Sequence, residues 1–318
     1  MVKSMSQSLA ASITKVASKQ TYYTIRFLVD RPLVDDAYRA YAYFRWVDDV
    51  VDEVTATGWD AGDAERLVRL RFLERQKALL EACLSREEPE EVDPHEAMLV
   101  ELIRHTDPSD PRLVGYLRHM MLVMEFDVGR RGRLVTRPEL DDYTRSLAIA
   151  VSEAMHYFIG NDAAARPDET RYLAVSGAHI VHMLRDTYPD LRAGYFNVPR
   201  EVLEASSIGP GDVRCDAYRA WVRERVALAR AYFEAGHSYF AHVQSRRHRL
   251  AGIAYMARFE WLMEALERNS FTLQAEYAEQ RSLATGLRMG GHVASSLARP
   301  RSLRRPAVQV ATIHADRS

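Results

Sequence analysis

Two aspartates four residues apart are the first feature of this sequence that could carry chemistry. Asp48 and Asp52 lie within residues 44–53, and in a helix two side chains at this spacing project from one face. Their like charges repel each other, which a solvated acidic face would tolerate. The apolar neighbours, among them Trp46 and Val50, instead favour burial. A buried pair of carboxylates requires a cation, and oxygen ligands select Mg²⁺ or Mn²⁺.

A second group of ligand-capable residues lies further along the chain. His179, His182, Asp186 and Asp190 are separated by three, four and four residues, which places them on one stripe of a helix. Taken alone, this set would also suit a softer metal, and a single buried histidine is more often a satisfied core residue. Pro189 disfavours helical backbone at the residue before it, so we expect the helix to kink or end there and to displace Asp190.

Two acidic helices that face each other across a bundle would form a cage for several divalent cations, and such cations bind the oxygens of a diphosphate. Metal ions neutralise a leaving diphosphate, so that a C–O bond to an allylic carbon can break and leave a carbocation. This step needs neither a nucleophile nor a general base. The absence of G-x-S-x-G, C-x-x-C and P-loop patterns from the sequence therefore does not count against an enzyme.

The elements that would position these residues are helices. Apolar residues recur at helical spacing, no convincing alternating strand pattern appears, and no repeat of fixed period is present. No linker-like stretch longer than about ten residues interrupts the pattern, so we expect an all-α protein built as a single-domain helical bundle. The expected helices cover residues 35–56, 63–84, 94–106, 110–128, 138–159, 168–188, 213–241 and 246–284.

The composition is that of a globular protein. The chain has 318 residues, 47% of them hydrophobic and 27% charged, and a formal net charge of −1, which excludes a disordered or strongly charged chain. Cys83 and Cys215 cannot make a disulfide framework, so we expect a reducing, cytoplasmic location. No apolar run approaches the roughly 18 residues of a membrane span, and the N-terminus lacks the apolar core of a signal peptide.

The paired motifs and their order resemble those of the squalene and phytoene synthases. The resemblance runs from about residue 18 to residue 286 and rests on Tyr41-Ala-Tyr-Phe-Arg45, Asp48-Asp-Val-Val-Asp52, Leu184-Arg185-Asp186-x-x-x-Asp190 and Tyr195-Phe-Asn-Val-Pro199. It implies an isoprenoid synthase-type helical bundle around a central cavity. Residues 1–17 would then be an N-terminal extension and residues 287–318 a flexible, Arg-rich tail.

The resemblance also implies roles for individual residues. It assigns the metal to the acidic side chains of both motifs and to one histidine: Asp48, Asp52, Asp186, Asp190 and His182. The diphosphate contacts would be Arg45, Arg185 and Thr21, the last only a loose match to the family's Ser/Lys contacts. The residues expected to line the substrate cavity are Tyr22, Tyr41, Tyr143, Tyr255, His179 and Ile149, although ordinary core packing is the alternative for each tyrosine.

Several positions depart from the family pattern. The family usually has Asn and Gln about one and two turns before Asp186, where this chain has His182 and His179. An imidazole in place of an amide oxygen weakens the preference for Mg²⁺. Ile149 and Ser152 replace the two glycines of the family's Ala-Gly-x-Val-Gly element and would narrow the cavity there. The half of the site that would take a second substrate is therefore the more altered one.

Three functions remain open from the sequence. The first is a Mg²⁺-dependent prenyltransferase that ionises an allylic prenyl diphosphate and couples it head-to-head to a second one, giving a squalene-like or phytoene-like hydrocarbon. The second keeps the ionisation but transfers the prenyl group to a non-prenyl acceptor, such as an electron-rich aromatic, or cyclises the chain with an imidazole as base. The third is a non-catalytic isoprenoid-binding scaffold, against which the intact first motif argues.

Cofactors and partners follow from the same patterns. Nothing resembles a dinucleotide fingerprint, so we do not expect NADPH. From Arg281 onward the chain contains seven arginines and a single acidic residue, Asp316, so this tail could contact an anionic membrane surface peripherally. The basic residues neither cluster on a reading element nor alternate with stacking aromatics, so we expect no nucleic-acid partner. The sequence leaves the prenyl chain length and the oligomeric state open.

Overall fold

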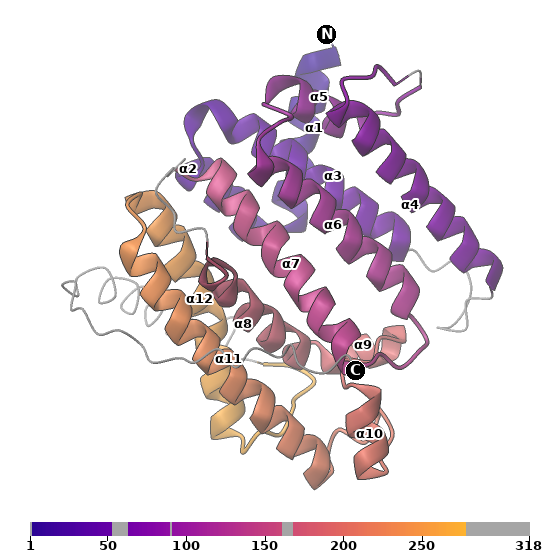
Figure 1. The fold of residues 1–318 in the computed structure, drawn as a ribbon, viewed down its shortest axis with the longest axis vertical. Helices are drawn as coiled ribbons and strands as arrows, with labels where there is room; N and C mark the ends of the chain where they lie inside the picture. Colours follow the sequence, from indigo (N-terminus) through magenta and orange to yellow (C-terminus); the bar gives the residue numbers. More distant parts are fainter. Residues whose placement is uncertain (1, 53–62, 90, 161–167, 278–318) are drawn as a thin grey trace, which may run out of the picture.

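The computed structural model describes residues 2–52, 63–89, 91–160 and 168–277 (Figure 1). All regular elements in these residues are helical, which confirms the all-α class. They are α1 (Val2–Ala17), α2 (Lys19–Leu28), the 3₁₀ turn η1 (Arg31–Leu33), α3 (Val34–Asp52), α4 (Asp63–Leu84), α5 (Glu96–His105), α6 (Pro111–Arg130), α7 (Arg137–Phe158), α8 (Thr170–Arg185), α9 (Thr187–Ala193), α10 (Arg200–Ser206), α11 (Asp216–His242) and α12 (Arg246–Arg268).

Several helices begin at residues whose side chains accept hydrogen bonds from free backbone N–H groups. Thr136 and Glu139 form a capping box at the start of α7, in which each side chain accepts a hydrogen bond from the backbone N–H of the other. Ser18 accepts from the backbone N–H of Thr21 at the start of α2. Asp110 accepts from the N–H of Arg112 at the start of α6. Such caps each contribute about 1 kcal/mol and define where a helix starts.

The bundle has two halves, which meet where α7 packs against α8. One core lies among α1 to α7 and contains the fully buried Tyr43 and Leu117. The other lies among α8 to α12 and contains the fully buried Leu184 and Phe233. In Figure 1, α7 crosses the middle of the molecule, with α3, α4 and α6 on one side and α8, α11 and α12 on the other.

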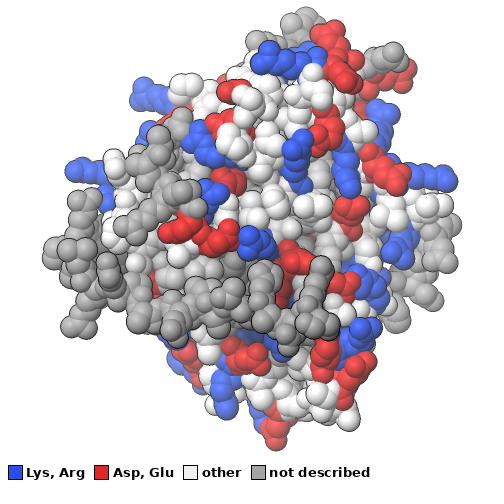
Figure 2. Space-filling view, in the orientation of Figure 1, with Lys and Arg blue, Asp and Glu red and all other residues white. Residues whose placement is uncertain are grey.

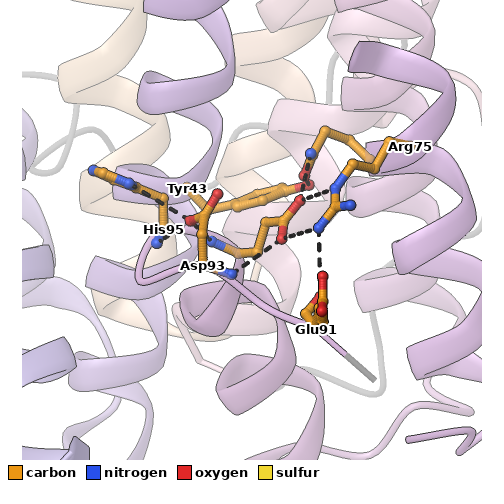
Figure 3. A network of polar contacts seen from close by, with 7 residues as sticks. Tyr43, Arg75, Glu91, Asp93 and His95 are labelled. Atoms are coloured by element: carbon orange, nitrogen blue, oxygen red, sulfur yellow. Dashed lines mark hydrogen bonds and ion pairs between the residues drawn. The ribbon is translucent and has the colours of Figure 1, made fainter. Parts of the chain in front are cut away.

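A buried polar network fixes the outer side of α3 against α4 and α5 (Figure 3). The Tyr43 hydroxyl donates to Oε1 of Gln76 at 3.0 Å, and Nε2 of Gln76 donates to Glu96 at 2.8 Å. Arg75 donates two further bonds to Glu96 at 2.8 and 2.9 Å. Tyr43 and Asp48 are five residues apart, which is about 140° around a helix. Because Tyr43 is anchored toward α4 and α5, Asp48 lies on a different face of α3, where it lines the cavity described below.

Two of the expected helices end earlier than predicted. The helix expected over 168–188 stops at Arg185, and α9 begins anew at Thr187. Pro189 lies in the first turn of α9, where its missing N–H leaves no hydrogen bond unmade, so the helix breaks before the proline rather than at it. The helix expected over 246–284 ends at Arg268, and Ser270 and Phe271 that follow have left-handed backbone.

The N-terminal residues form a helix that the sequence analysis did not predict. Helix α1 was not predicted from the periodicity, and its Ala10 and Thr14 are fully buried against the bundle. The boundary between an N-terminal extension and the main domain stays a prediction. The Arg-rich tail expected over 287–318 lies outside the described residues. None of the helices in the described residues is long and apolar enough to cross a membrane.

Candidate active site

The first acidic motif occupies the last two turns of α3. Arg45 donates to Oδ2 of Asp48 at 3.1 Å and also pairs with Asp49. The Asp48 side chain is 34% exposed, against 56% for Asp49, because the two lie about 100° apart around the helix. Burial, together with the neighbouring charge of Asp52, raises the pKa of Asp48 to about 6 against the opposing effect of Arg45. Arg45 therefore compensates the charge of this motif only in part.

The second motif lies at the break between α8 and α9. Arg185 donates two hydrogen bonds to the Asp186 carboxylate, at 2.6 and 2.5 Å. Nε2 of His182 lies 2.9 Å from Oδ2 of Asp186. Burial would raise the pKa of Asp186, but the hydrogen bonds from Arg185 and His182 outweigh it and hold the pKa below its usual range. Asp186 is therefore an ionised carboxylate with two partners from the last turn of α8.

Asp190, one turn into α9, is held from the other side. Nδ2 of Asn197 donates to Oδ2 of Asp190 at 2.6 Å. Burial nevertheless raises the pKa of Asp190 to about 6, against the lowering effects of Asn197 and Arg130. The helix break thus leaves Asp190 close enough to Asp186 to feel its charge, but with a separate hydrogen-bond partner.

Four residues to which the sequence analysis assigned no role connect the two motifs, although Tyr195 and Asn197 belong to a segment that carried the family resemblance. Asp127 and Arg130 lie one turn apart on α6, and Nε of Arg130 donates to Asp127 at 2.7 Å. The same guanidinium donates to Oδ1 of Asn197 at 2.8 Å. The Tyr195 hydroxyl donates to Oδ1 of Asp52 at 3.1 Å. An acid and an arginine three residues apart in a largely apolar helix were the available signal for the α6 pair.

The donor set fits a hard divalent cation. Asp52 and Asp127 lie close enough to Asp48 to raise its pKa, and Asp186 raises that of Asp190. Arg130 is near both groups, since it pairs with Asp127 and lowers the pKa of Asp190. Carboxylate oxygens are the ligands that Mg²⁺ and Mn²⁺ prefer. Within the described residues, no three acidic, histidine or cysteine side chains already converge into a closed metal site. The roles of the four aspartates and of His182 as ligands stay predictions.

An apolar cavity of about 410 Å³ opens beside the first motif, between α2, α3, α6 and α7. Of the residues predicted for the site, Thr21, Tyr41, Arg45 and Asp48 line it. Most of the other lining side chains are apolar, including Met120 on α6. The cavity has the size of a small-ligand pocket and joins an apolar chamber to a charged end.

The other predicted cavity residues lie elsewhere. Tyr22 stacks on Tyr38 with ring centroids 5.3 Å apart. The hydroxyl of Tyr143 donates to Oδ2 of Asp127 at 3.0 Å, which places this ring beside the Asp127 and Arg130 pair rather than along the apolar cavity. None of these side chains is among those that line the 410 Å³ cavity. Their contact with a substrate stays a prediction.

Ile149 and Tyr255 lie in a separate small cluster around the buried Tyr172 and Val175, across the seam between α7 and α8. A void of only about 10 Å³ remains beside Tyr255 and Ser152, close to the volume that one water occupies. The space that the family pattern would open with glycines is therefore largely filled in this chain.

His179 is buried against Tyr143, edge to face, with ring centroids 4.9 Å apart. Both of its ring nitrogens are buried without a hydrogen-bond partner among the described residues. Burial holds its pKa well below the usual range, so the imidazole is neutral at physiological pH. An unsatisfied buried imidazole is uncommon, and His179 does not line the 410 Å³ cavity.

An all-helical bundle with an apolar cavity that opens beside the first of two acidic motifs is the arrangement of an isoprenoid synthase-type fold. The squalene/phytoene synthase family model matches residues 14–285, and the chain belongs to this family. This match confirms the resemblance inferred from the motifs, and members of the family are prenyltransferases. A comparison with curated protein sequences gave no match.

Solved structures share the fold. A squalene synthase from Alicyclobacillus acidocaldarius is 21% identical, with a TM-score of 0.64 over 85% of this chain and 95% of that one. A dehydrosqualene synthase crystallised with a ligand is 17% identical, with a TM-score of 0.67 over 92% of this chain and 97% of that one. At these identities the likeness concerns the fold.

Proposed function

We propose that this protein is a Mg²⁺-dependent prenyltransferase that ionises an allylic prenyl diphosphate. The prenyl chain would lie in the 410 Å³ cavity and the diphosphate at its charged end. The observation that carries the proposal is the continuity between these two regions: the same cavity is lined by apolar side chains and by Thr21, Arg45 and Asp48. A lipid with an anionic head is the class of ligand that this combination fits.

The chain's own residues would divide the work of ionisation. Arg45 faces the cavity end and can pair with a diphosphate oxygen. Mg²⁺, or Mn²⁺, held by Asp48, Asp52, Asp186 and Asp190, would supply the charge neutralisation that makes diphosphate a good leaving group. The apolar wall excludes water from the allylic carbon, and the Tyr41 ring offers a π face that attracts a cation without capturing it.

For the acceptor, family membership favours a second prenyl diphosphate joined head-to-head, which would give a squalene-like or phytoene-like hydrocarbon. The filled region around Ile149 and Tyr255 favours a second candidate, in which a single prenyl donor meets a non-prenyl acceptor or cyclises. An electron-rich aromatic is the acceptor class to test first.

The test is incubation of the purified protein with farnesyl or geranylgeranyl diphosphate and Mg²⁺. A C30 or C40 hydrocarbon supports head-to-head coupling. Diphosphate release with a cyclic product from one donor supports cyclisation, and consumption of the donor only when an aromatic acceptor is added supports transfer. No diphosphate release with any common donor, in Mg²⁺ or Mn²⁺, would refute the enzyme proposal and favour a scaffold. Adding NADPH to the same assay would show whether the product is reduced, which we do not expect.

A peripheral membrane contact fits the outer face of α2. One face of α2 lines the cavity through Thr21 and Ile25. The opposite face exposes Tyr23 (51%) and Phe27 (68%), whose rings stack 6.1 Å apart. The first 34 residues hold five Lys or Arg and one acid, a net charge of 5 − 1 = +4 in a chain whose total is −1. Aromatic side chains beside basic ones are typical of a helix that lies on an anionic bilayer.

This contact can be tested by flotation with anionic and zwitterionic vesicles. Tyr23→Ser with Phe27→Ser should weaken binding to anionic vesicles, because both exposed rings are lost. Leu67→Ser with Val68→Ser is the matched control, since these side chains are 49% and 65% exposed on α4, on the opposite side of the bundle in Figure 1. Equal flotation of both double variants would refute the α2 contact. On the face shown in Figure 2, acidic and basic side chains are interspersed, which gives no reason to expect a nucleic-acid partner.

A further inference from the structure

We propose that Arg130 is a positioning residue that joins the two acidic motifs before any metal binds. Through Asn197 and Tyr195 it would hold one oxygen of Asp190 and one of Asp52, and would leave the second oxygen of each for a metal. This inference rests on the proposed function. It adds that the guanidinium of Arg130 holds the carboxylates of Asp52 and Asp190 in place for the metal.

The guanidinium of Arg130 is in a position that few arginines take. Only 6% of the residue is exposed, and its charge is matched by Asp127, whose side chain is itself 20% exposed. The guanidinium carbon lies 5.0 Å from the ring centroid of Tyr143 and 4.7 Å from that of Tyr195. A planar cation held by two rings and an ion pair is fixed in orientation.

The first arm runs through Asn197 to α9. Arginine has only donors, so the Asn197 oxygen must face Arg130 and the Asn197 NH₂ group must face away. That NH₂ donates to Oδ2 of Asp190 at 2.6 Å. The orientation of the amide is therefore determined by the guanidinium 2.8 Å from its oxygen. Among the residues that the structure describes, no hydrogen bond reaches the other oxygen of Asp190.

The second arm runs through Tyr195 to α3. Its ring lies under Arg130 and also 5.8 Å from the guanidinium carbon of Arg131, and its hydroxyl donates to Oδ1 of Asp52. Both arms start from the loop after α9 and end on different acidic motifs. Residues from α3, α6 and α9 are thereby linked by hydrogen bonds of 2.6 to 3.1 Å and by the contact between Arg130 and the Tyr195 ring, 4.7 Å from its centroid.

The experiment measures Mn²⁺ binding by calorimetry and by the electron paramagnetic resonance of free Mn²⁺, in full-length protein without substrate. Asn197→Leu removes the first arm, and Tyr195→Phe removes the second while keeping the ring. Each should weaken Mn²⁺ binding about 10-fold to 100-fold, as loss of a hydrogen bond to a metal ligand does elsewhere. Tyr38→Phe, which removes a hydroxyl bonded to the Tyr22 carbonyl, is the matched control and should bind as the wild type does.

Arg130 itself is tested by a paired substitution, because removing it alone would leave Asp127 buried without a counter-charge. Asp127→Asn with Arg130→Gln removes both charges together and should retain the helical circular dichroism while losing Mn²⁺ affinity to a similar degree. Wild-type affinity in folded Asn197→Leu and Tyr195→Phe would overturn the positioning role but leave the enzyme proposal intact. A wild-type protein that binds no Mn²⁺ and releases no diphosphate would overturn both.

Discussion

Nε2 of His182 lies 2.9 Å from Oδ2 of Asp186, on the last turn of α8. The same carboxylate accepts two hydrogen bonds from Arg185, its neighbour in sequence. His182 occupies the position where the family pattern has an amide, and its imidazole is within hydrogen-bond distance of the Asp186 carboxylate. Asp186 is thus the aspartate of the site whose charge is best compensated, whereas the pKa values of Asp48 and Asp190 are raised to about 6.

The relationship predicts an effect on metal preference. In His182→Asn, an amide oxygen replaces an imidazole nitrogen, and oxygen is the donor that Mg²⁺ prefers. We expect the ratio of activity in Mg²⁺ to activity in Mn²⁺ to rise by about tenfold, the lower end of what changes near a metal ligand produce. Initial rates of diphosphate release across a series of concentrations of each metal would measure it. An unchanged ratio would show that His182 acts only on Asp186.

Asp48 and Asp49 offer a comparison between neighbours. Asp48→Asn removes a carboxylate that lines the cavity end, and we expect diphosphate release to fall by about 10²-fold to 10³-fold, the usual loss for one electrostatic group of an active site. Asp49→Asn changes an aspartate that is more exposed and does not line the cavity, so its rate should stay within about threefold of the wild type. Equal losses in the two variants would contradict the site.

Stability without metal should depend on pH in a defined direction. The pKa of Asp48 is about 6 in the folded protein against 3.8 for the ordinary group, so the folded state binds the extra proton between these values. Its contribution to stability is therefore greatest below pH 4 and is lost as the pH rises through 6. A shift of two units corresponds to about 3 kcal/mol, but the side chain is one-third exposed, so about 1 kcal/mol is a fair expectation.

The measurement is urea unfolding of the metal-free wild type and Asp48→Asn at pH 5 and pH 7.5. The variant should gain stability relative to the wild type at the higher pH. Saturating Mg²⁺ should raise the wild-type Tm more at pH 7.5 than at pH 5, because the metal competes with protons for the carboxylates. A Mg²⁺ shift that is the same at both pH values would show that Asp48 and Asp190 are not in the metal site.

The cavity makes a prediction about chain length. Ala154 on α7 lines the apolar chamber, and Ala154→Phe would fill part of its 410 Å³. The kcat/KM for geranylgeranyl diphosphate should fall about tenfold or more relative to that for farnesyl diphosphate, because the longer chain loses its room first. The shorter donor is the internal control for folding. An equal loss for both donors would indicate that the prenyl chain lies elsewhere.

His179 predicts an outcome for stability. Both of its nitrogens are buried without a partner among the described residues, and an apolar side chain of similar volume would remove that penalty. His179→Leu should therefore raise the free energy of unfolding by about 1 to 3 kcal/mol, read from urea titration. If diphosphate release falls strongly in the same variant, His179 contacts the substrate as the sequence predicted. A less stable variant would mean that the imidazole has a partner after all.

The sequence by itself determined the helical class, the spacing of both acidic motifs and one end of the cavity. Asp48 and Asp52 share a face, because one helix period relates residues that are close in the chain. Thr21, Tyr41 and Arg45 were expected at the site from the family resemblance, and they line the same cavity as Asp48. Local signals of this kind depend on a few neighbouring residues. These signals predicted the ends of helices less well, as at the break between Arg185 and Thr187, where one continuous helix was expected.

Only the tertiary structure decided how the motifs are connected. Asp127 and Asn197 are 70 residues apart, and neither residue type nor spacing shows that Arg130 would bind both. The same holds for Tyr255, which belongs to the cluster around Ile149 rather than to the wall of the 410 Å³ cavity. The distances between helices are set by how their side chains interlock across the whole bundle, and that packing has no signature in any single stretch of sequence.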